Sequence, residues 1–362
     1  MRACLLAVAA IAGAGSTGTG TGVAQAAATP PYPPSTHITG MSFRWETYRR
    51  LAPGSDNWPL TWSADGHQYT SFGDGGGFGG TGTRGRVSLG FARVEGNASD
   101  YSGRNVWGGV GAEVPATFTG KSYGLLAIGT DLYMWRCGAG SNRTAYRFQQ
   151  LYKSTDSAKT WRAANWQFPG SLTFYCPTFL QFGQGYAGAR DDYAYMYAAE
   201  RNSDAWEVHA PGRVMLMRAP KNRLMDRAAY RFFAGRDARG APRWSANIAE
   251  RAPVFEDPNG ARLPSAIYNT GLRRYLLTTT FAPRGAGNIA ISDAPEPWGP
   301  WTTVLYQEGW GSGHISASTF FSNFSPKWWS DAGKGFVAVF TGSGQIDTWN
   351  SVEGDFTVPV AP

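Results

Sequence analysis

The segment DNWPLTWSADGHQYTSFGDGGGF (residues 56–78) has the pattern from which the fold can be predicted. Two runs with aromatic residues flank the tight turn Ala64-Asp65-Gly66, which predicts a β-hairpin over about residues 61–72. Polar and glycine-rich stretches flank this hairpin on both sides. The segment therefore predicts a loop, a hairpin and a second loop. The aromatic members of the hairpin are Trp62, Tyr69 and Phe72.

The same pattern, a polar turn followed by a strand with alternating aromatic residues, recurs along the chain. The five instances are Trp62–Phe72, Leu125–Trp135, Tyr193–Tyr197, Arg274–Thr280 and Gly335–Thr341. Their starts are 63, 68, 81 and 61 residues apart. Five units of similar length predict an all-β fold, a five-bladed β-propeller whose blades are four-stranded sheets.

The composition agrees with many short strands joined by tight turns. The chain has 47 glycines and 14% aromatic residues but only 16% charged residues. So much aromatic surface has to be buried, which excludes a disordered chain. We expect a single propeller domain over residues 41–358. The stretch from Lys221 to Phe233 is the one predicted helix, because its apolar residues recur at helical spacing.

The N-terminus has the features of a secretory signal peptide. Arg2 precedes an apolar run, and Ala24-Gln25-Ala26 forms a small-residue cleavage site. We therefore expect residues 1–26 to be removed, residues 27–40 to form a flexible leader, and the protein to be secreted, extracellular or periplasmic. The apolar run is too short to span a membrane. Two of the three cysteines, Cys137 and Cys176, remain after cleavage, and a disulfide between them is plausible in an oxidising compartment.

The formal net charge of +7 suggests acidic partners, such as uronic-acid or cell-wall polysaccharides. The basic residues are scattered, and no nucleic-acid-binding motif is present. Four histidines give no metal-ligand spacing, so we expect no cofactor, with a structural Ca²⁺ in the Asp-rich turns left open. We expect a monomer.

The octapeptide Ser154-Thr-Asp-Ser-Ala-Lys-Thr-Trp161 resembles the Asp-box of sialidase-like propellers. The chain departs from that motif at Ala158, where glycine is usual. The motif is a hairpin turn that packs its tryptophan beneath a blade. Asp156 is accordingly expected to be structural.

Asp56 and Asp74 are the main catalytic candidates. They stand at the two ends of the first hairpin, with Trp58 nearby as a stacking surface for a sugar. Two carboxylates at one rim are the minimum needed for cleaving a glycosidic bond. The alternative is that both aspartates cap turns.

Five motifs together resemble the secreted propellers grouped as domain of unknown function 4185. They are Asp56-Asn-Trp-Pro-Leu-Thr-Trp62, Gly73-Asp-Gly-Gly-Gly-Phe78, Gly120-Lys-Ser-Tyr-Gly124, Ala187-Gly-Ala-Arg-Asp-Asp-Tyr193 and Ala294-Pro-Glu-Pro-Trp-Gly-Pro-Trp301. The resemblance extends from about Asp56 to Phe356. Some members of that group are endo-D-arabinanases that cut mycobacterial arabinan, with acidic residues at the mouth of a five-bladed propeller. The resemblance implies that Asp56 and Asp74 match the catalytic carboxylates.

Further residues at blade entries are candidates for the same site. Asp192 is a candidate third carboxylate, and Asp191 and Arg190 precede it as candidates for binding substrate. Structural ion pairs and solvated surface positions are the competing explanations. The remaining candidates for substrate binding are Lys121, Tyr123, His67 and His314.

Three functions remain open at this point. The first is a glycoside hydrolase in which one aspartate is the general acid and the other is the general base or the nucleophile. For this enzyme we expect inversion of the anomeric centre. The second is a polysaccharide lyase, in which His67 or His314 with a tyrosine removes a proton and Arg190 or Lys121 neutralises a uronate. The third is a glycan-binding propeller without catalytic activity.

Overall fold

The computed structural model describes residues 27–139, 146–202, 207–315, 319–343 and 346–359. The expected signal peptide, residues 1–26, lies outside the described residues. Within them, the regular structure consists of strands and six short 3₁₀ turns. No helix in the described ranges is long and apolar enough to cross a membrane. The prediction of an all-β fold is confirmed.

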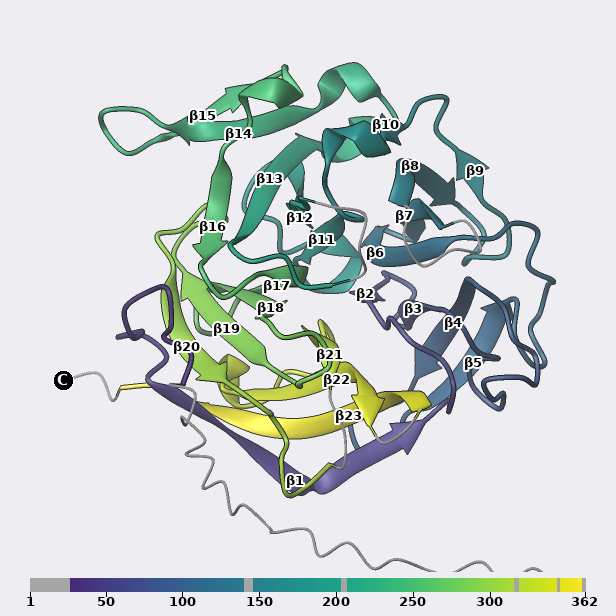
Figure 1. The fold of residues 1–362 in the computed structure, drawn as a ribbon. Coiled ribbons are helices and arrows are strands. Elements are labelled where there is room, and N and C mark those ends of the chain that lie inside the picture. The colour runs from purple at the N-terminus through teal and green to yellow at the C-terminus, as the bar shows by residue number, and fades with distance from the viewer. Residues whose placement is uncertain (1–26, 140–145, 203–206, 316–318, 344–345, 360–362) are drawn as a thin grey trace, which may run out of the picture.

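Figure 1 shows the strands as twisted antiparallel sheets arranged around a common centre. The strands of the first half are β1 (Gly40–Leu51), β2 (Leu60–Trp62), β3 (Gln68–Phe72), β4 (Gly90–Glu95), β5 (Ser102–Trp107), β6 (Lys121–Ile128), β7 (Asp131–Ala139), β8 (Tyr146–Ser154), β9 (Arg162–Ala163), β10 (Phe168–Pro169), β11 (Thr178–Gln181) and β12 (Tyr193–Ala199). The second half contains β13 (Gly212–Pro220), β14 (Arg231–Arg236), β15 (Pro242–Ser245), β16 (Pro253–Asp257), β17 (Arg262–Asn269), β18 (Arg274–Thr280), β19 (Ile289–Ala294), β20 (Thr302–Gln307), β21 (Phe320–Phe324), β22 (Gly335–Ser343) and β23 (Ile346–Thr357).

The 3₁₀ turns lie in the connections between these strands. They are η1 (Gly170–Leu172), η2 (Gln184–Tyr186), η3 (Lys221–Arg223), η4 (Arg227–Ala229), η5 (Ile248–Glu250) and η6 (Asp331–Gly333). The helix predicted over residues 221–233 is wrong, because two such turns and the start of β14 occupy that stretch. Asp226 caps the second turn by accepting a hydrogen bond from the Ala228 amide, and this favours a turn over a continuous helix.

Most strands pair with their neighbours in sequence, as expected for a repeated antiparallel unit. The sheet orders are β2-β3-β4-β5, β6-β7-β8-β10, and β21-β22-β23-β1. The largest sheet contains two such units, β11 to β16 and β17 to β20, joined by a parallel pairing of β11 with β17. The N-terminal strand β1 is paired with the C-terminal strand β23 from Gly40↔Thr357 to Leu51↔Trp349, so the two ends of the chain share one sheet.

The strands β2, β6, β11, β17 and β21 are the inner strands, since residues from all five line one small internal cavity of about 10 Å³. The centre of the molecule is therefore filled by side chains, with room for about one water molecule. We call the side on which the inner strands begin the start face, and the side on which they end the finish face. Connections into inner strands lie on the start face, and turns such as Ser63–His67 between β2 and β3 lie on the finish face.

The Asp-box turn is structural, as the sequence predicts. Asp156 accepts hydrogen bonds from Ser154 Oγ (2.8 Å), the Thr160 amide (2.9 Å) and Thr160 Oγ1 (2.6 Å). Ala158 has a φ of 70°, the left-handed conformation that glycine adopts without strain. Trp161 packs on Phe91 of another sheet, with ring centroids 4.4 Å apart.

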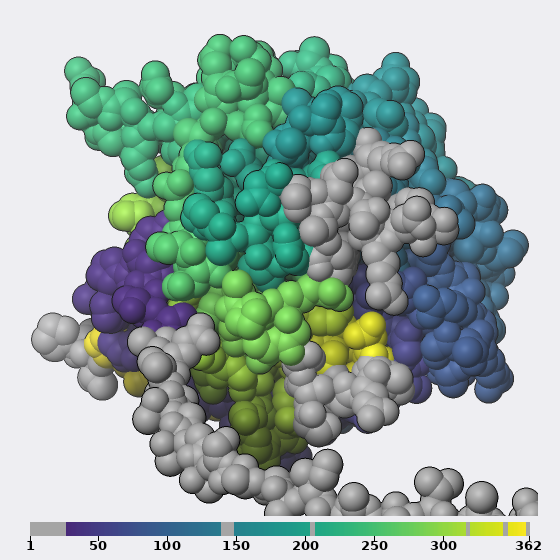
Figure 2. All heavy atoms as spheres, in the orientation of Figure 1, coloured from purple at the N-terminus to yellow at the C-terminus, as the bar shows by residue number. Residues whose placement is uncertain are grey.

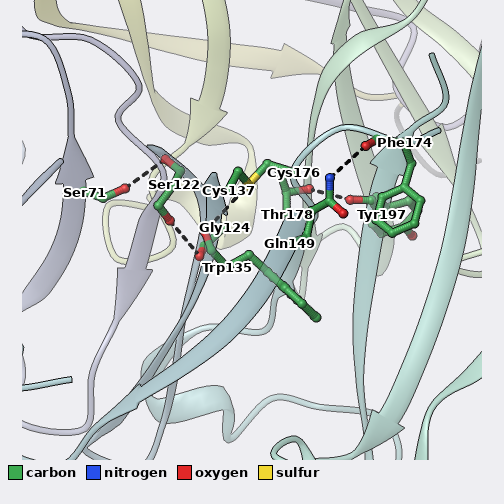
Figure 3. Close-up of a disulfide and its surroundings, with 10 residues drawn as sticks. All are labelled: Ser71, Ser122, Gly124, Trp135, Cys137, Gln149, Phe174, Cys176, Thr178 and Tyr197. Atoms are coloured by element: carbon green, nitrogen blue, oxygen red, sulfur yellow. Dashed lines mark hydrogen bonds between the residues drawn. A yellow bond between two sulfur atoms is a disulfide. The ribbon is translucent and has the colours of Figure 1, made fainter. Parts of the chain in front are cut away.

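Cys137 and Cys176 form a disulfide, with their Cα atoms 5.6 Å apart. Figure 3 shows the bond between β7 and the segment that leads into β11. It joins two neighbouring sheets in the buried core. Cys137 also lies opposite Lys121 in the β6–β7 ladder, so the disulfide fixes the strand next to the start of β6.

We predict that Cys137→Ala/Cys176→Ala lowers the free energy of unfolding by about 2–5 kcal/mol, because the bond closes a loop of 39 residues that is otherwise free in the unfolded chain. Urea denaturation followed by tryptophan fluorescence measures this. The wild-type protein in excess reductant is the control, and its urea midpoint should move toward that of the variant. Equal midpoints for the variant and the oxidised wild type would contradict the prediction.

Candidate functional site

Lys121 brings Asp56 and Asp74 together on the start face. Lys121 is the first residue of β6, Asp56 precedes β2, and Asp74 follows β3. The lysine Nζ atom lies 2.6 Å from Asp74 Oδ2 and 3.8 Å from Asp56 Oδ1. One ammonium group therefore contacts both carboxylates. The distance between their two contacting oxygen atoms cannot exceed the sum of those two distances.

The backbone around Gly73 makes this approach possible. The Asp56 amide donates to the Gly73 carbonyl, and the Gly73 amide donates back to the Asp56 carbonyl, both at 2.9 Å. A Cβ atom on residue 73 would lie 2.7 Å from Lys121 Nζ and 2.9 Å from Asp56 Oδ1. A side chain at this position would therefore displace the Lys121 ammonium group and the Asp56 carboxylate from each other. Asp74 follows with a φ of 57°, a conformation of higher energy for a non-glycine residue that is frequent at functional sites.

Asp56 is the buried member of the pair, with 7% of its surface exposed. Its Oδ1 atom accepts no hydrogen bond from the described residues, and Lys121 compensates its charge through space. Burial raises the pKa of Asp56 to about 6, Lys121 opposes this rise, and the charges of Asp74 and Asp347 add to it. Asp56 can therefore keep its proton in mildly acidic solution.

Asp74 is the exposed member of the pair, and two cations contact it. Its side chain is 41% exposed and forms ion pairs with Lys121 and with Arg86, the latter at 3.3 Å. The Arg86 guanidinium also donates to the Asp74 carbonyl, which fixes the turn. The two carboxylates thus differ in burial and in charge compensation, as an acid and a base in one site require.

Asp347 is a third carboxylate in this site, and we did not predict it from the sequence. It is the second residue of β23, and its carbonyl accepts a hydrogen bond of 2.6 Å from the Gly54 amide, two residues before Asp56. Burial raises the pKa of Asp347, with a further contribution from Asp74, while Lys121 and Arg284 lower it. The available signal was the sequence Thr341-Gly-Ser-Gly-Gln-Ile-Asp347, which repeats the pairing of glycines with an aspartate seen around Asp74.

The start face collects these residues from distant parts of the sequence. In Figure 2, yellow residues of the C-terminal part lie between light-green residues on one side and purple residues of the N-terminal part on the other. Asp56, Lys121, Asp347 and Arg284 come from four different sheets or the connections between them. The site therefore depends on the arrangement of the sheets around the centre.

Four other predicted residues lie on the finish face, apart from the carboxylate pair. Arg190, Asp191 and Asp192 follow β11, and His67 follows β2. The Asp192 side chain is 99% exposed and is 3.5 Å from Lys221. Asp191 accepts hydrogen bonds from Tyr195 Oη (2.6 Å) and the Tyr193 amide (2.9 Å). Loops that lead into the strands of a blade lie on both faces of such a fold. The sequence does not say on which face a given loop lies.

Arg190 has structural partners on that face. Its guanidinium donates to Tyr275 Oη (3.3 Å) and to the Pro295 carbonyl (3.2 Å), and it lies 3.5 Å from Glu296. These contacts agree with the ion-pair explanation considered from the sequence.

Three further candidates have no free surface at the carboxylates. Trp58 is completely buried and packs edge-on against Trp349, so it offers no face to a sugar in this structure. Tyr123 is 1% exposed and packs against Phe321. His314 is exposed but stacks on Trp45 of the outermost strand β1, 4.8 Å between ring centroids.

The lyase alternative is weakened by these positions. Neither His67 nor His314 lies beside Lys121, and Arg190 lies on the finish face. On the start-face side, Tyr175 Oη is 2.7 Å from His209 Nε2, but both side chains are at most 5% exposed and are therefore poorly placed to remove a substrate proton. In the described part of the chain, no group of three or more His, Cys, Asp or Glu side chains is placed to hold a metal ion.

A family model described as "Domain of unknown function (DUF4185)" matches residues 124–334, more than half of the chain. The chain belongs to this family. The matched residues begin after Lys121, so the match confirms the resemblance without including Asp56 or Asp74. A search of curated proteins found no match.

Solved structures similar to this DUF4185 protein include a β-xylosidase, RS223, with 12% identity, a TM-score of 0.50, and coverage of 86% of this chain and 98% of that one. An α-L-arabinanase from Penicillium chrysogenum has 11% identity, a TM-score of 0.45 and coverages of 88% and 97%. A GH43_12 protein from a capybara gut metagenome has 11% identity and a TM-score of 0.47; 88% of this chain matches 57% of that longer chain. At 12% identity, the likeness to the β-xylosidase concerns the fold alone.

We predict that Asp56→Asn stabilises this DUF4185 protein near neutral pH. Since the folded-state pKa of Asp56 is about 6, above the ordinary 3.8, its contribution to stability is fully present below about pH 4 and is lost as the pH rises through 6. One pKa unit corresponds to about 1.4 kcal/mol, so the neutral amide should gain up to about 3 kcal/mol at pH 7 and nothing at pH 4.

Urea denaturation of both proteins at pH 4 and pH 7 measures this difference. Asp192→Asn is the matched control, because its exposed carboxylate should give no gain at either pH. A gain for Asp56→Asn that is equal at both pH values would show that the ionisation of Asp56 is not its cause.

Proposed function

We propose that this protein is a secreted glycoside hydrolase that cleaves a polysaccharide, with Asp56 and Asp74 as its catalytic pair. The observation that carries the proposal is the unequal carboxylate pair around Lys121, one buried with a raised pKa and one exposed and paired with two cations. Such a difference assigns the acid and the base of a glycosidase.

Asp56 is the proposed general acid. Its burial keeps it protonated up to about pH 6, and it donates that proton to the oxygen of the leaving sugar. Asp74, paired with Lys121 and Arg86, activates a water molecule or attacks the anomeric carbon. Asp347 maintains the raised pKa of Asp56 through its negative charge. We infer inversion when Asp74 activates water and retention when it attacks directly; the anomer of the first product, read by NMR, distinguishes them.

We further propose a single domain with five blades. The supporting units are β2 to β5, β6 to β10, β11 to β16, β17 to β20, and β21 to β23 with β1. The similar fold of a protein named as a β-xylosidase supports a role on glycosidic bonds. The residues 1–26, with their apolar run and cleavage site, support secretion. The net charge of +7 favours an acidic or cell-wall glycan as substrate.

We predict that the mature protein releases reducing ends from at least one polymer in a panel of neutral and uronic-acid polysaccharides that includes arabinan. Asp56→Asn and Asp74→Asn should each lower kcat by about 10²–10⁴-fold, the usual contribution of a general acid or base. Asp192→Asn should retain full activity. Products that absorb in the near ultraviolet would instead identify a lyase, and an active Asp74→Asn would exclude the proposed pair.

We predict opposite pH shifts for two neighbours of Asp56. Asp347→Asn removes a negative charge that raises the pKa of Asp56, so the high-pH limb of activity should move to lower pH. Lys121→Gln removes a positive charge that lowers this pKa, so the same limb should move to higher pH. Profiles of kcat against pH measure both, and shifts in one common direction would contradict the assignment of Asp56 as the acid.

A further inference from the structure

The finish face contains a cavity of about 460 Å³, far larger than the cavity of about 10 Å³ in the centre of the molecule. It is formed where inner strands end, and its lining includes Trp62, Tyr268, Asn269, Thr270, Trp329 and Asp331. Asp56 and Lys121 stand where β2 and β6 begin, so the filled centre separates this cavity from the carboxylates. Its volume is within the range of about 300–1,000 Å³ that is usual for small-molecule sites.

Aromatic side chains form much of the cavity wall, and neighbouring rings hold them in place. Trp329 stacks on Phe324 with ring centroids 6.0 Å apart. Tyr268 packs against Phe182 at 5.5 Å and against Tyr275 at 4.8 Å. Trp62 and Trp329 are half-buried, so part of each ring remains accessible. Such rings offer flat apolar faces at little cost in conformational entropy.

Hydrogen bonds and close packing hold the loop on one side of the cavity. Asn269 donates to the Gly333 carbonyl (2.8 Å) and accepts from the Leu272 amide (3.0 Å), which locks two connections together. Asp331 and Ala332 have φ values of 45° and 51°, in the left-handed region. A Cβ atom on Gly271 would lie 1.8 Å from the Ala332 carbonyl, so the two segments are in direct contact. A strained loop held in this way is frequent where a ligand is clamped.

The charges of the cavity select against an acidic ligand. Its lining has one charged side chain, Asp331, and no lysine or arginine. Outside the lining, Lys334 lies 3.9 Å from the Asp331 carboxylate, and Arg190 contacts the Tyr268 ring and is paired with Glu296. The rim has hydroxyl and carboxylate groups on exposed Thr270, Ser330 and Asp331, which can accept hydrogen bonds from sugar hydroxyls.

We propose that this cavity is a second carbohydrate-binding site, which holds a neutral sugar unit of a polysaccharide with its ring against Trp329 or Trp62. Stacked aromatic faces contact the C–H side of the sugar, and the polar rim binds its hydroxyl groups. The site lies on the face opposite Asp56 and Asp74. It goes beyond the proposed cleavage and does not depend on it, because binding would persist in a protein that cannot hydrolyse the polymer.

Affinity gel electrophoresis tests this proposal. The mature chain carrying Asp56→Asn, which leaves polymers intact, is run through gels containing arabinan, xylan, galactan, β-glucan or polygalacturonate. We expect retardation by at least one neutral polymer. Trp329→Ala added to this chain should weaken that retardation at least tenfold. Trp298→Ala is the matched control, since Trp298 is also half-buried but packs on Trp244 outside the cavity.

Thr270→Trp provides a second variant that does not remove core contacts. Residue 270 is exposed at the rim, so the larger side chain should block the cavity and abolish retardation while the thermal unfolding temperature stays unchanged. Retention that persists in Thr270→Trp and Trp329→Ala would overturn the proposal. So would retardation by polygalacturonate alone, by no polymer, or equal loss in Trp298→Ala. Hydrolysis of a short soluble substrate by the chain with native Asp56 reports separately on the catalytic pair.

Discussion

The pairing of β1 with β23 is the constraint on which the rest of the structure depends. It joins the two ends of the chain in one antiparallel ladder, and the strand order then closes around the centre. Asp56 lies in the connection from β1 to β2, and Asp347 is the second residue of β23, so the same ladder brings these two carboxylates to one place. The hydrogen bond from the Gly54 amide to the Asp347 carbonyl joins the segment after β1 to β23 next to these carboxylates. A site built from one sheet alone would lack one of its acids.

The two faces of the molecule have different chemistry, although the same inner strands begin on one face and end on the other. On the start face, charged groups gather around Lys121, and one carboxylate is buried without a hydrogen bond to Oδ1. On the finish face, aromatic rings and a strained loop surround an open cavity. The filled centre lies between these two environments.

Local patterns in the sequence predicted much of the fold, because they depend on neighbours in the chain. The hairpin across Ala64-Asp65-Gly66 and the Asp-box turn both formed as expected. The pairing of Cys137 with Cys176 also formed. The stretch at residues 221–233 failed because its apolar spacing fits a helix, whereas the capping by Asp226 and the pairing of β14 with β13 favour turns and a strand.

The candidate site was harder to predict because its residues meet only in three dimensions. Asp56, Asp74 and Lys121 were found from their motifs, and the structure brings them together. Asp192 and Arg190 have a local sequence similar to that around Asp56 and Asp74 but lie on the other face. They follow an inner strand, whereas Asp56 precedes one. Trp58 adjoins Asp56 in sequence, yet its ring turns into the core. Asp347 was missed because the glycines that precede it resemble those around Asp74 but do not indicate that it lies near residue 54.

The closure between β1 and β23 also sets an order of events during synthesis. Strands that lie about 300 residues apart in the chain cannot pair until the last of them exists, and such long-range contacts form late because a large loop has to close first. The earlier sheets have local pairings and can form while the chain grows. A nascent chain that ends before residue 347 therefore has Asp56, Asp74 and Lys121 without the third acid or the closing strand, and the complete carboxylate cluster arises only after β23 has been synthesised.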